Sequence, residues 1–333
     1  MGLKWLITGG CGFLGTSLIQ RLMKEGGHEI RVLDDLSVGT RDDLSEVCQF
    51  VEMNTSEDFS NWSEDKTQLI VGNIMDDKLA VEVTKAADVI VHLAANTGVG
   101  PSVEDPRTDC MYNVIGTFNY LEGARLNKVD RFIFASSGAP AGEVEPPIHE
   151  EMPPHPVSPY GASKLAGEGY CSAYFKTFGV NTVCLRFGNV YGPRSKHKSS
   201  VVAKFIKHAL NGEILEIYGD GTQTRDFIYI DDLINAVVLA STKDNVGGEV
   251  FQIASNRETT VGEMVEMLLP ILGANGIKGV QLKYGEKRLG DVMRNYSDTT
   301  KARDVLEWVP LFDLEMGIEN TLVYFLKTMN FTA

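Results

Sequence analysis

Short apolar runs that alternate with amphipathic stretches fill the first half of this chain and constrain its fold most strongly. The stretches between the runs, such as 14–24 and 79–86, carry apolar residues at helical spacing. Alternation of this kind predicts an α/β fold, with a doubly wound parallel sheet and right-handed crossovers. In such sheets a ligand binds beyond the carboxyl ends of the strands, where the strand order reverses. The expected strands are Lys4–Thr8, Glu29–Leu33, Gln68–Val71, Val89–Leu93, Arg131–Ala135 and Thr182–Arg186.

Two segments interrupt this alternation. Residues 51–66 are polar and acidic, and we expect them to form a surface excursion. Residues 143–159 hold six prolines, too many for a helix, so we expect a stiff loop that delivers Tyr160 to the start of a helix. After about residue 187, glycines punctuate shorter elements, which predicts a second, smaller α/β lobe. The expected domains are 1–186 with about 226–255, and 187–225 with 256–333.

The charge balance argues against two classes of partner. The chain has 31 Lys and Arg against 45 Asp and Glu, which gives a formal net charge of −14. Nucleic acids and anionic membranes would be repelled, and no long basic run breaks the pattern. An anionic substrate would therefore need a few well-placed cations to hold it.

Cysteine and histidine patterns argue against a disulfide framework and a metal site. The five cysteines are scattered and form no C-x-x-C pair, and the six histidines lack metal-ligand spacing. The N-terminal residues enter an apolar strand without a signal-peptide pattern, and no apolar stretch is long enough to span a bilayer. These features predict a cytoplasmic protein that binds no metal.

A glycine-rich turn follows the first expected strand and opens the first helix. Its glycines, Gly9, Gly12 and Gly15, have G-x-x-G-x-x-G spacing, which suits a tight turn whose backbone touches a pyrophosphate at a helix N-terminus. Asp34 ends the second strand 25 residues after Gly9, near the spacing expected for a carboxylate that binds a ribose. A carboxylate there repels a 2′-phosphate, and Asp35 adds to that effect. The turn therefore predicts NAD binding, although a glycine triplet alone could be a flexible loop.

Two further segments carry groups suited to proton transfer. Tyr160 and Lys164 lie one helical turn apart and share a helix face. An ammonium and a positive nicotinamide nearby would both lower the pKa of the phenol, so that Tyr160 could act as a general base. Tyr and Lys at this spacing are also common on exposed helix surfaces where they have no function. The apolar strand that ends at Ser136 and Ser137 raises the odds of a functional pair, because its carboxyl end should lie beside the nicotinamide.

Taken together, these motifs resemble an extended short-chain dehydrogenase/reductase, with a Rossmann-like sheet. More narrowly, they resemble the NAD-dependent nucleotide-sugar epimerase/dehydratase family and its UDP-hexose 4-epimerases. The resemblance runs in order over nearly the whole chain. The segments that carry it are Thr8–Gly15, His92–Ala95, Ser136-Ser137, Tyr160–Lys164, Arg186–Pro193 and Gly219–Asp232.

The resemblance implies roles for particular residues. The catalytic set would be Ser137, Tyr160 and Lys164, and the first two would also contact the sugar. Asn189, Arg225 and the 288–291 stretch, with Arg288 and Asp291, would hold the diphosphate and nucleoside of the substrate. The NAD-binding residues would be Gly9, Gly12, Phe13, Leu14, Gly15, Asp34, Asp35, Asn73, Ile74, Leu93, Ala94, Ala95, Tyr160 and Lys164.

The residues after Ser137 bear on the reaction. Dehydratases and decarboxylases of this family place a carboxylate directly after the hydroxyl, whereas this chain has Gly138-Ala139-Pro140 and no carboxylate before Glu143. That absence favours epimerisation at C4 of a UDP-sugar through a 4-keto intermediate. A dehydratase or decarboxylase that uses Glu143, and a catalytically silent NAD sensor, are the alternatives. Pro140-Ala141 replaces the family's usual Val-Tyr, which leaves the sugar open.

Two further features bear on the sugar and on assembly. Asn295 takes the place of the family residue that gates N-acetyl groups, and a basic loop, 194–198, would either contact a uronate or be solvated. Family members commonly form homodimers through two helices, here 114–126 and 160–178. The expected apolar surface of these helices comes from Tyr112, Phe118, Tyr120, Leu165, Tyr170 and Tyr174.

Overall fold

The computed structural model describes residues 2–198, 200–286 and 292–328, and they form two compact units. Unit 1 comprises residues 1–142, 150–186 and 234–251. Unit 2 comprises residues 143–149, 187–233 and 252–333. The proline-rich segment thus contributes its first part to unit 2 and its second part to unit 1.

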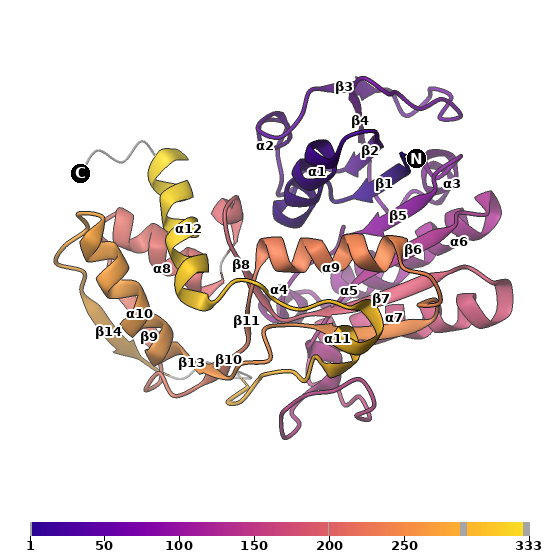
Figure 1. Ribbon diagram of the computed structural model, residues 1–333. Helices are drawn as coiled ribbons and strands as arrows, with labels where there is room; N and C mark the ends of the chain where they lie inside the picture. Colours follow the sequence, from indigo (N-terminus) through magenta and orange to yellow (C-terminus); the bar gives the residue numbers. More distant parts are fainter. Residues whose placement is uncertain (1, 199, 287–291, 329–333) are drawn as a thin grey trace. The chain divides into compact units, whose positions relative to one another are not determined.

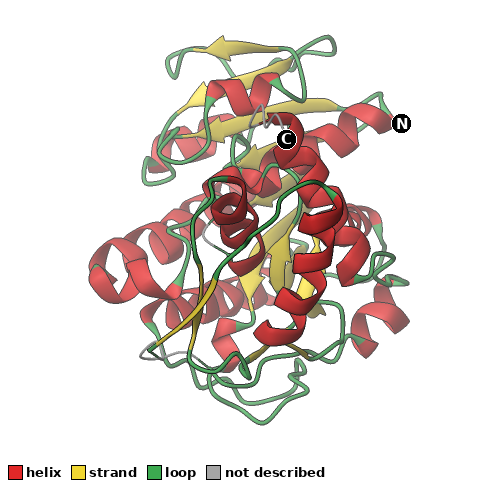
Figure 2. Cartoon of the chain, turned by 90° about the vertical axis from the view of Figure 1, so that its left-hand side faces the viewer, coloured by secondary structure: helices red, strands yellow, loops and turns green. Residues whose placement is uncertain are grey.

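Unit 1 is built on a sheet with the strand order β12-β7-β6-β5-β1-β2-β4-β3. β1 pairs in parallel with β2 and β5, and the order reverses there, because β2 leads to one edge and β5 to the other. All six expected strands are present, and Figures 1 and 2 show helices on both faces of the sheet. The strands are β1 (Lys4–Thr8), β2 (Glu29–Asp34), β3 (Phe50–Met53), β4 (Thr67–Val71), β5 (Val89–His92), β6 (Arg131–Ser137), β7 (Thr182–Phe187) and β12 (Glu249–Ile253).

The start and the end of α7 in unit 1 have a clear local cause. In α7, Ser158 caps the N-terminus, Pro159 occupies the first turn, and Gly179 ends the helix in the left-handed conformation. α7 therefore starts where expected and carries Tyr160 in its first turn. The helices are α1 (Phe13–Glu25), α2 (Arg41–Ser45), α3 (Asp77–Val83), α4 (Val99–Glu104), α5 (Pro106–Cys110), η1 (Met111–Gly116), α6 (Thr117–Asn127), η2 (Ala139–Ala141), α7 (Pro159–Phe178) and α9 (Ile230–Thr242), the last of which begins in unit 2.

The expected surface excursion at 51–66 is wrong in part. The segment begins within β3, which pairs in parallel with β4, and it fully buries Phe59. The physical reason is Arg31, which is wholly buried and therefore needs partners for its guanidinium. Its Nη2 donates to the Asn61 carbonyl at 3.0 Å, and its guanidinium carbon lies 4.0 Å from the centre of the Trp62 ring. The segment is thus pinned over the edge of the sheet.

Within its described residues, unit 2 has three two-stranded sheets and several helices. β8 and β11 pair in parallel, as do β9 and β14, whereas β10 and β13 are antiparallel. Over the described ranges of both units, no helix is long and apolar enough to cross a membrane. The elements are β8 (Asn189–Tyr191), η3 (Ser195–His197), α8 (Val201–Leu210), β9 (Leu215–Tyr218), β10 (Thr224–Arg225), β11 (Phe227–Tyr229), β13 (Thr259–Thr260), α10 (Val261–Ala274), β14 (Leu282–Gly285), α11 (Thr300–Leu306) and α12 (Leu314–Thr328).

Candidate active site

The glycine turn lies at the point where the strand order reverses, between the ends of β1 and β5. Gly9 has φ of 70°, and a Cβ there would lie 2.9 Å from the Ala94 backbone nitrogen. A Cβ on Gly15 would lie 2.5 Å from the Gly9 carbonyl oxygen, so both positions need glycine. No side chain caps the start of α1 at Gly12, and its first turn holds no acidic residue. Backbone N–H groups and the helix dipole can therefore meet a phosphate there, and Gly12, Phe13 and Leu14 are only partly buried.

Asp34 ties the glycine turn to the end of β2. Its side chain is 7% exposed and accepts hydrogen bonds from the backbone N–H of Cys11 and of Leu36, both at 2.9 Å. Burial raises the pKa of Asp34, and the two backbone hydrogen bonds lower it in part. Asp35 is exposed and accepts from the Ser37 N–H. A ribose hydroxyl would thus meet a carboxylate whose position is already fixed.

The other predicted NAD-binding residues follow the ends of β4 and β5. Asn73 donates from Nδ2 to the Tyr112 hydroxyl at 3.0 Å, and Ile74 is buried. The backbone N–H of Ala94 donates to the Thr8 hydroxyl at 3.2 Å, which joins the ends of β1 and β5. Leu93, Ala94 and Ala95 are partly buried. The structure therefore gathers the predicted residues at one edge of the sheet, and these residues and backbone groups suit a dinucleotide.

His92 is a buried member of this edge whose ring chemistry the motifs did not reveal. Its Nδ1 lies 2.9 Å from the Thr8 hydroxyl and its Nε2 3.2 Å from the Thr117 hydroxyl. The ring stacks on Tyr120, with the centroids 5.3 Å apart. Burial, aided by the charge of Lys164, lowers the pKa of His92 to about 3. The imidazole is therefore neutral and can both donate and accept a hydrogen bond.

The predicted reacting groups come from β6 and α7 of unit 1. Ser137 ends β6, and its hydroxyl is hydrogen-bonded to the Tyr160 side chain. Lys164 is 4% exposed and donates from Nζ to the Ala135 carbonyl at 2.8 Å. Its Nζ lies 5.9 Å from the centre of the Tyr160 ring. A phenol, a hydroxyl and an ammonium thus meet at the carboxyl ends of the strands, where a parallel sheet of this kind is expected to bind the nicotinamide.

The protein groups around Tyr160 do not lower the pKa of its phenol. Burial raises the pKa of Tyr160 to about 12, the hydrogen bond from Ser137 acts to lower it, and the charge of Asp109 raises it further. The expected lowering therefore needs more positive charge than these groups supply. A bound nicotinamide cation carries such a charge.

A buried ion pair joins β7 to α7 close to the reacting groups, and a hydrogen bond ties β6 to the same carboxylate. Glu168 and Arg186 are each 5% exposed at the side chain, and the guanidinium Nε and Nη2 donate to the two carboxylate oxygens at 2.8 Å. The Ser136 hydroxyl also donates to Glu168 at 2.6 Å. Sequence reasoning missed this contact. A Glu one turn after Lys164 and an Arg within an apolar strand are the only signals for it.

Two of the residues predicted to hold the diphosphate and nucleoside of the substrate are described in unit 2. Asn189 and Arg225 line a cavity of about 240 Å³ together with Lys204 and Tyr218, which sequence reasoning missed. The Arg225 Nη1 donates to the Val292 carbonyl at 2.8 Å, which orients the guanidinium. Arg288 and Asp291 lie outside the described residues.

The basic loop at 194–198 is partly engaged within unit 2. The Lys207 Nζ donates to the carbonyls of Lys196 and Lys198 at 2.8 and 2.9 Å. Burial lowers the pKa of the Lys198 side chain. The backbone N–H of Asn295 donates to the Thr224 hydroxyl at 3.1 Å. None of these contacts identifies a sugar.

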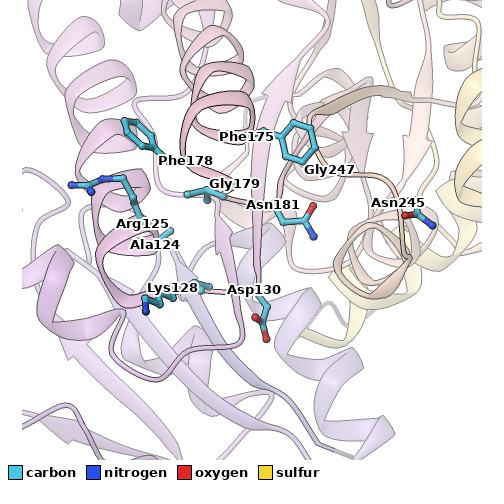
Figure 3. A pocket seen from close by; sticks show the side chains of 12 residues that line it. Ala124, Arg125, Lys128, Asp130, Phe175, Phe178, Gly179, Asn181, Asn245 and Gly247 are labelled. Atoms are coloured by element: carbon cyan, nitrogen blue, oxygen red, sulfur yellow. The ribbon is translucent and has the colours of Figure 1, made fainter.

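A cavity of about 640 Å³ lies in unit 1 away from the predicted site residues, none of which lines it. Its walls are the last turns of α6 and α7 and the residues that precede β6 and β7, namely Asp130 and Asn181 (Figure 3). Because the strands run in parallel, this is the edge opposite the glycine turn. Its volume alone therefore does not mark it as the reaction site.

The expected apolar surface of α6 and α7 is wrong for two of its aromatic residues. Tyr120 is fully buried, and Tyr174 is 5% exposed and donates to Glu122 at 2.6 Å. Both pack in the core of unit 1, Tyr120 against the His92 ring, and Gly167 lets α7 approach Phe134 of β6 closely. Tyr170 is exposed, and it contacts Phe118 edge to face at 5.6 Å.

Sequence similarity places the chain among known proteins. The family described as "NAD dependent epimerase/dehydratase family" matches residues 5–254. A putative UDP-glucose 4-epimerase of Methanocaldococcus jannaschii is 35% identical over 332 residues, which cover 98% of this chain and 99% of that protein.

Solved structures are similar over the same length. UDP-glucose 4-epimerase of Thermotoga maritima, with UDP-glucose, has a TM-score of 0.87 and 33% identity over 98% of this chain and 100% of that one. UDP-glucuronic acid 4-epimerase of Bacillus cereus, with UDP-glucuronic acid and NAD, has a TM-score of 0.85 and 30% identity. The match covers 98% of this chain and 99% of that one. The resemblance found in the motifs thus extends to the whole fold.

Proposed function

This chain belongs to the NAD-dependent epimerase/dehydratase family, and from this premise we propose that it inverts C4 of a UDP-sugar. It is an enzyme, and NAD is its cofactor. One observation carries the proposal beyond the family. The Ser137 hydroxyl, the Tyr160 phenol and the Lys164 ammonium meet at the sheet edge that the glycine turn shares.

In this reaction Tyr160 takes the proton of the 4-hydroxyl and later returns it. NAD, when bound, would supply the acceptor for the hydride of C4 and the donor that returns it. Ser137 hydrogen-bonds the same sugar oxygen and steadies the phenol, and Lys164 favours the phenolate through its charge. Asp34 binds the adenosine ribose, and the N–H groups at the start of α1 hold the pyrophosphate.

The inversion requires the 4-keto sugar to turn while its carrier stays bound. We assign the carrier to the unit 2 cavity, where Asn189 and Arg225 lie together with Lys204. Guanidinium and ammonium groups bind diphosphate oxygens and overcome the overall charge of −14. Because no carboxylate follows Ser137 before the exposed Glu143, elimination of water or loss of carbon dioxide is the second-ranked reaction.

Two further assignments are part of the proposal. The protein works in the cytoplasm, and it forms a homodimer through α6 and α7. Exposed Met111, Ile115, Leu126, Tyr170 and Phe178 support the dimer, because they lie on or beside these helices. Sedimentation of the wild type and of Tyr170→Glu tests it, and a wild type that sediments as a monomer would contradict it.

Incubation with single UDP-sugars tests the function. We expect UDP-glucose, UDP-N-acetylglucosamine or UDP-glucuronic acid to yield the C4 epimer at unchanged mass, as seen by chromatography and mass spectrometry. A product lighter by water or carbon dioxide would instead assign the dehydratase or decarboxylase reaction. NAD binding without any product would assign the sensor.

A further inference from the structure

A buried carboxylate lies beside the proposed reacting groups and has no place in the mechanism above. Asp109 is the fourth residue of the short helix α5 and is 1% exposed. Its Oδ1 accepts a hydrogen bond from the Asn113 side chain at 2.8 Å. Its Oδ2 is buried and has no hydrogen-bond partner among the described residues. A carboxylate in this state is costly unless a positive charge acts on it.

The contacts of Asp109 lead directly to α7. The same Asn113 Nδ2 also reaches the Ser163 hydroxyl at 3.2 Å, and Ser163 is hydrogen-bonded to the Asp109 carboxylate. The single proton of the Ser163 hydroxyl is thus shared between the Asp109 carboxylate and the Tyr160 carbonyl oxygen, which lies 3.0 Å away, and Lys164 is the next residue. Asn113 itself sits in the π-helical turn η1, a distortion that is frequent at functional sites. Asp109 is therefore connected through Asn113 and Ser163 to the first turns of α7, the helix that carries both reacting groups.

The charges around Asp109 come from few groups. Lys164 on α7 is the cation that acts on it, and η1 contributes the neutral Asn113. The charge of Asp109 acts in turn on the Tyr160 phenol. His92 on β5 is neutral above a pH of about 3. On the adjoining helices, Glu104 is exposed and Arg107 acts on Asp105.

We propose that Asp109 is a positioning residue whose buried negative charge holds Lys164 and sets the pH range in which the Tyr160–Lys164 pair works. A negative charge favours the protonated form of every group near it. Asp109 therefore keeps the ammonium charged and keeps the phenol able to take its proton back, which a reversible proton transfer requires. Burial raises the pKa of Asp109 itself, whereas the Ser163 hydrogen bond, the Lys164 charge and the Asn113 hydrogen bond act to lower it.

The test replaces the charge and keeps the shape. For Asp109→Asn, both limbs of the pH profile of kcat/KM should move to lower pH by roughly one unit, because phenol and ammonium both lose a neighbouring anion. The matched control is Glu104→Gln, which removes an equal charge from an exposed position five residues away and should leave the profile unchanged. Asp109→Glu keeps the charge, and both limbs of its pH profile should lie at the same pH as in the wild type.

A second readout does not depend on turnover and so separates this inference from the proposed function, on which it rests. The ultraviolet absorbance of phenolate is titrated in the NAD-loaded protein, and the Tyr160→Phe titration is subtracted. The midpoint should fall in Asp109→Asn by a similar amount, even if no UDP-sugar is turned over.

Two results would overturn the inference. One is an Asp109→Asn protein with lower activity at every pH but unchanged limbs and an unchanged phenolate midpoint, which would make Asp109 merely structural. The other is an Asp109→Glu protein whose limbs shift as those of Asp109→Asn do. If Asp109→Asn does not fold, Asp109→Ser removes the same charge, and the same expectations apply to it.

Discussion

The two edges of the sheet in unit 1 differ in how their polar groups are held. At the edge with the glycine turn, Asp34, His92 and Lys164 are nearly inaccessible to solvent, and each has hydrogen-bond partners. At the opposite edge, a cavity of about 640 Å³ is lined by exposed Lys128 and Asn245 (Figure 3). The polar groups around this cavity thus face water.

This difference in solvent exposure indicates which edge of the sheet is suited to catalysis. A buried polar group interacts strongly with a developing charge, because little water screens it. A wide cavity lined by solvated groups lacks that property. Substitutions at the edge with the glycine turn should therefore change the activity and its pH dependence. Substitutions at the opposite edge should change only the stability, and only modestly.

The largest effect should come from Tyr160→Phe. Loss of the phenol removes the proposed general base, and we expect the turnover rate to fall by about 10²- to 10⁴-fold. The NAD content and the thermal unfolding midpoint should stay close to those of the wild type. Tyr170→Phe, on the exposed face of the same helix, is the control and should turn over normally. A normal rate in Tyr160→Phe would refute the assigned base.

His92 should make the protein sensitive to acid. Its pKa is about 3 in the folded state and 6.5 as the ordinary value, so the unfolded state takes up the proton first as the pH falls. The stability is fully present above pH 6.5 and is lost progressively towards pH 3, by several kcal/mol.

His92→Phe keeps a ring in the stack on Tyr120 but cannot be protonated. Urea unfolding of this variant should therefore show a much flatter pH dependence between pH 6.5 and 3 than the wild type. An equally steep dependence would assign the acid sensitivity to other groups.

Asp34→Asn should weaken NAD binding by roughly 10- to 100-fold, because a hydrogen bond to a charged group contributes about 1.5–3 kcal/mol. The variant should also discriminate less strongly against NADP. Asp35→Asn removes the same charge from an exposed side chain and should have a smaller effect. Thermal-shift titrations with both dinucleotides measure the two variants. Equal losses in both would place the ribose contact elsewhere.

The smallest effect should come from the opposite edge. Lys128 ends α6 with φ of 54°, a left-handed conformation that costs a side-chain-bearing residue about 1–2 kcal/mol. Lys128→Gly should therefore raise the free energy of unfolding by about 0.5–1 kcal/mol and leave turnover unchanged. Lys128→Ala removes the same side chain but should bring no such gain. A change in turnover in either variant would show that this edge takes part in function.

Much of the fold and of the candidate site followed from local pattern. Apolar periodicity located all six expected strands, and the glycine spacing placed the turn beside Asp34. The end of the proline-rich segment at residue 159 marked the start of the helix that carries Tyr160 and Lys164. These features are local, since a strand, a turn or a helix end is decided by residues within one or two turns of one another.

Only the tertiary structure revealed the contacts that join distant segments. The Glu168–Arg186 pair, the Asn113–Ser163 contact and the partners of His92 join elements that are far apart in the sequence, so local pattern does not pair these residues with one another. The burial of Phe59 and Tyr120 was misjudged for the same reason. Whether an aromatic residue faces water or the core depends on what the rest of the chain packs against it, and local periodicity carries no such information.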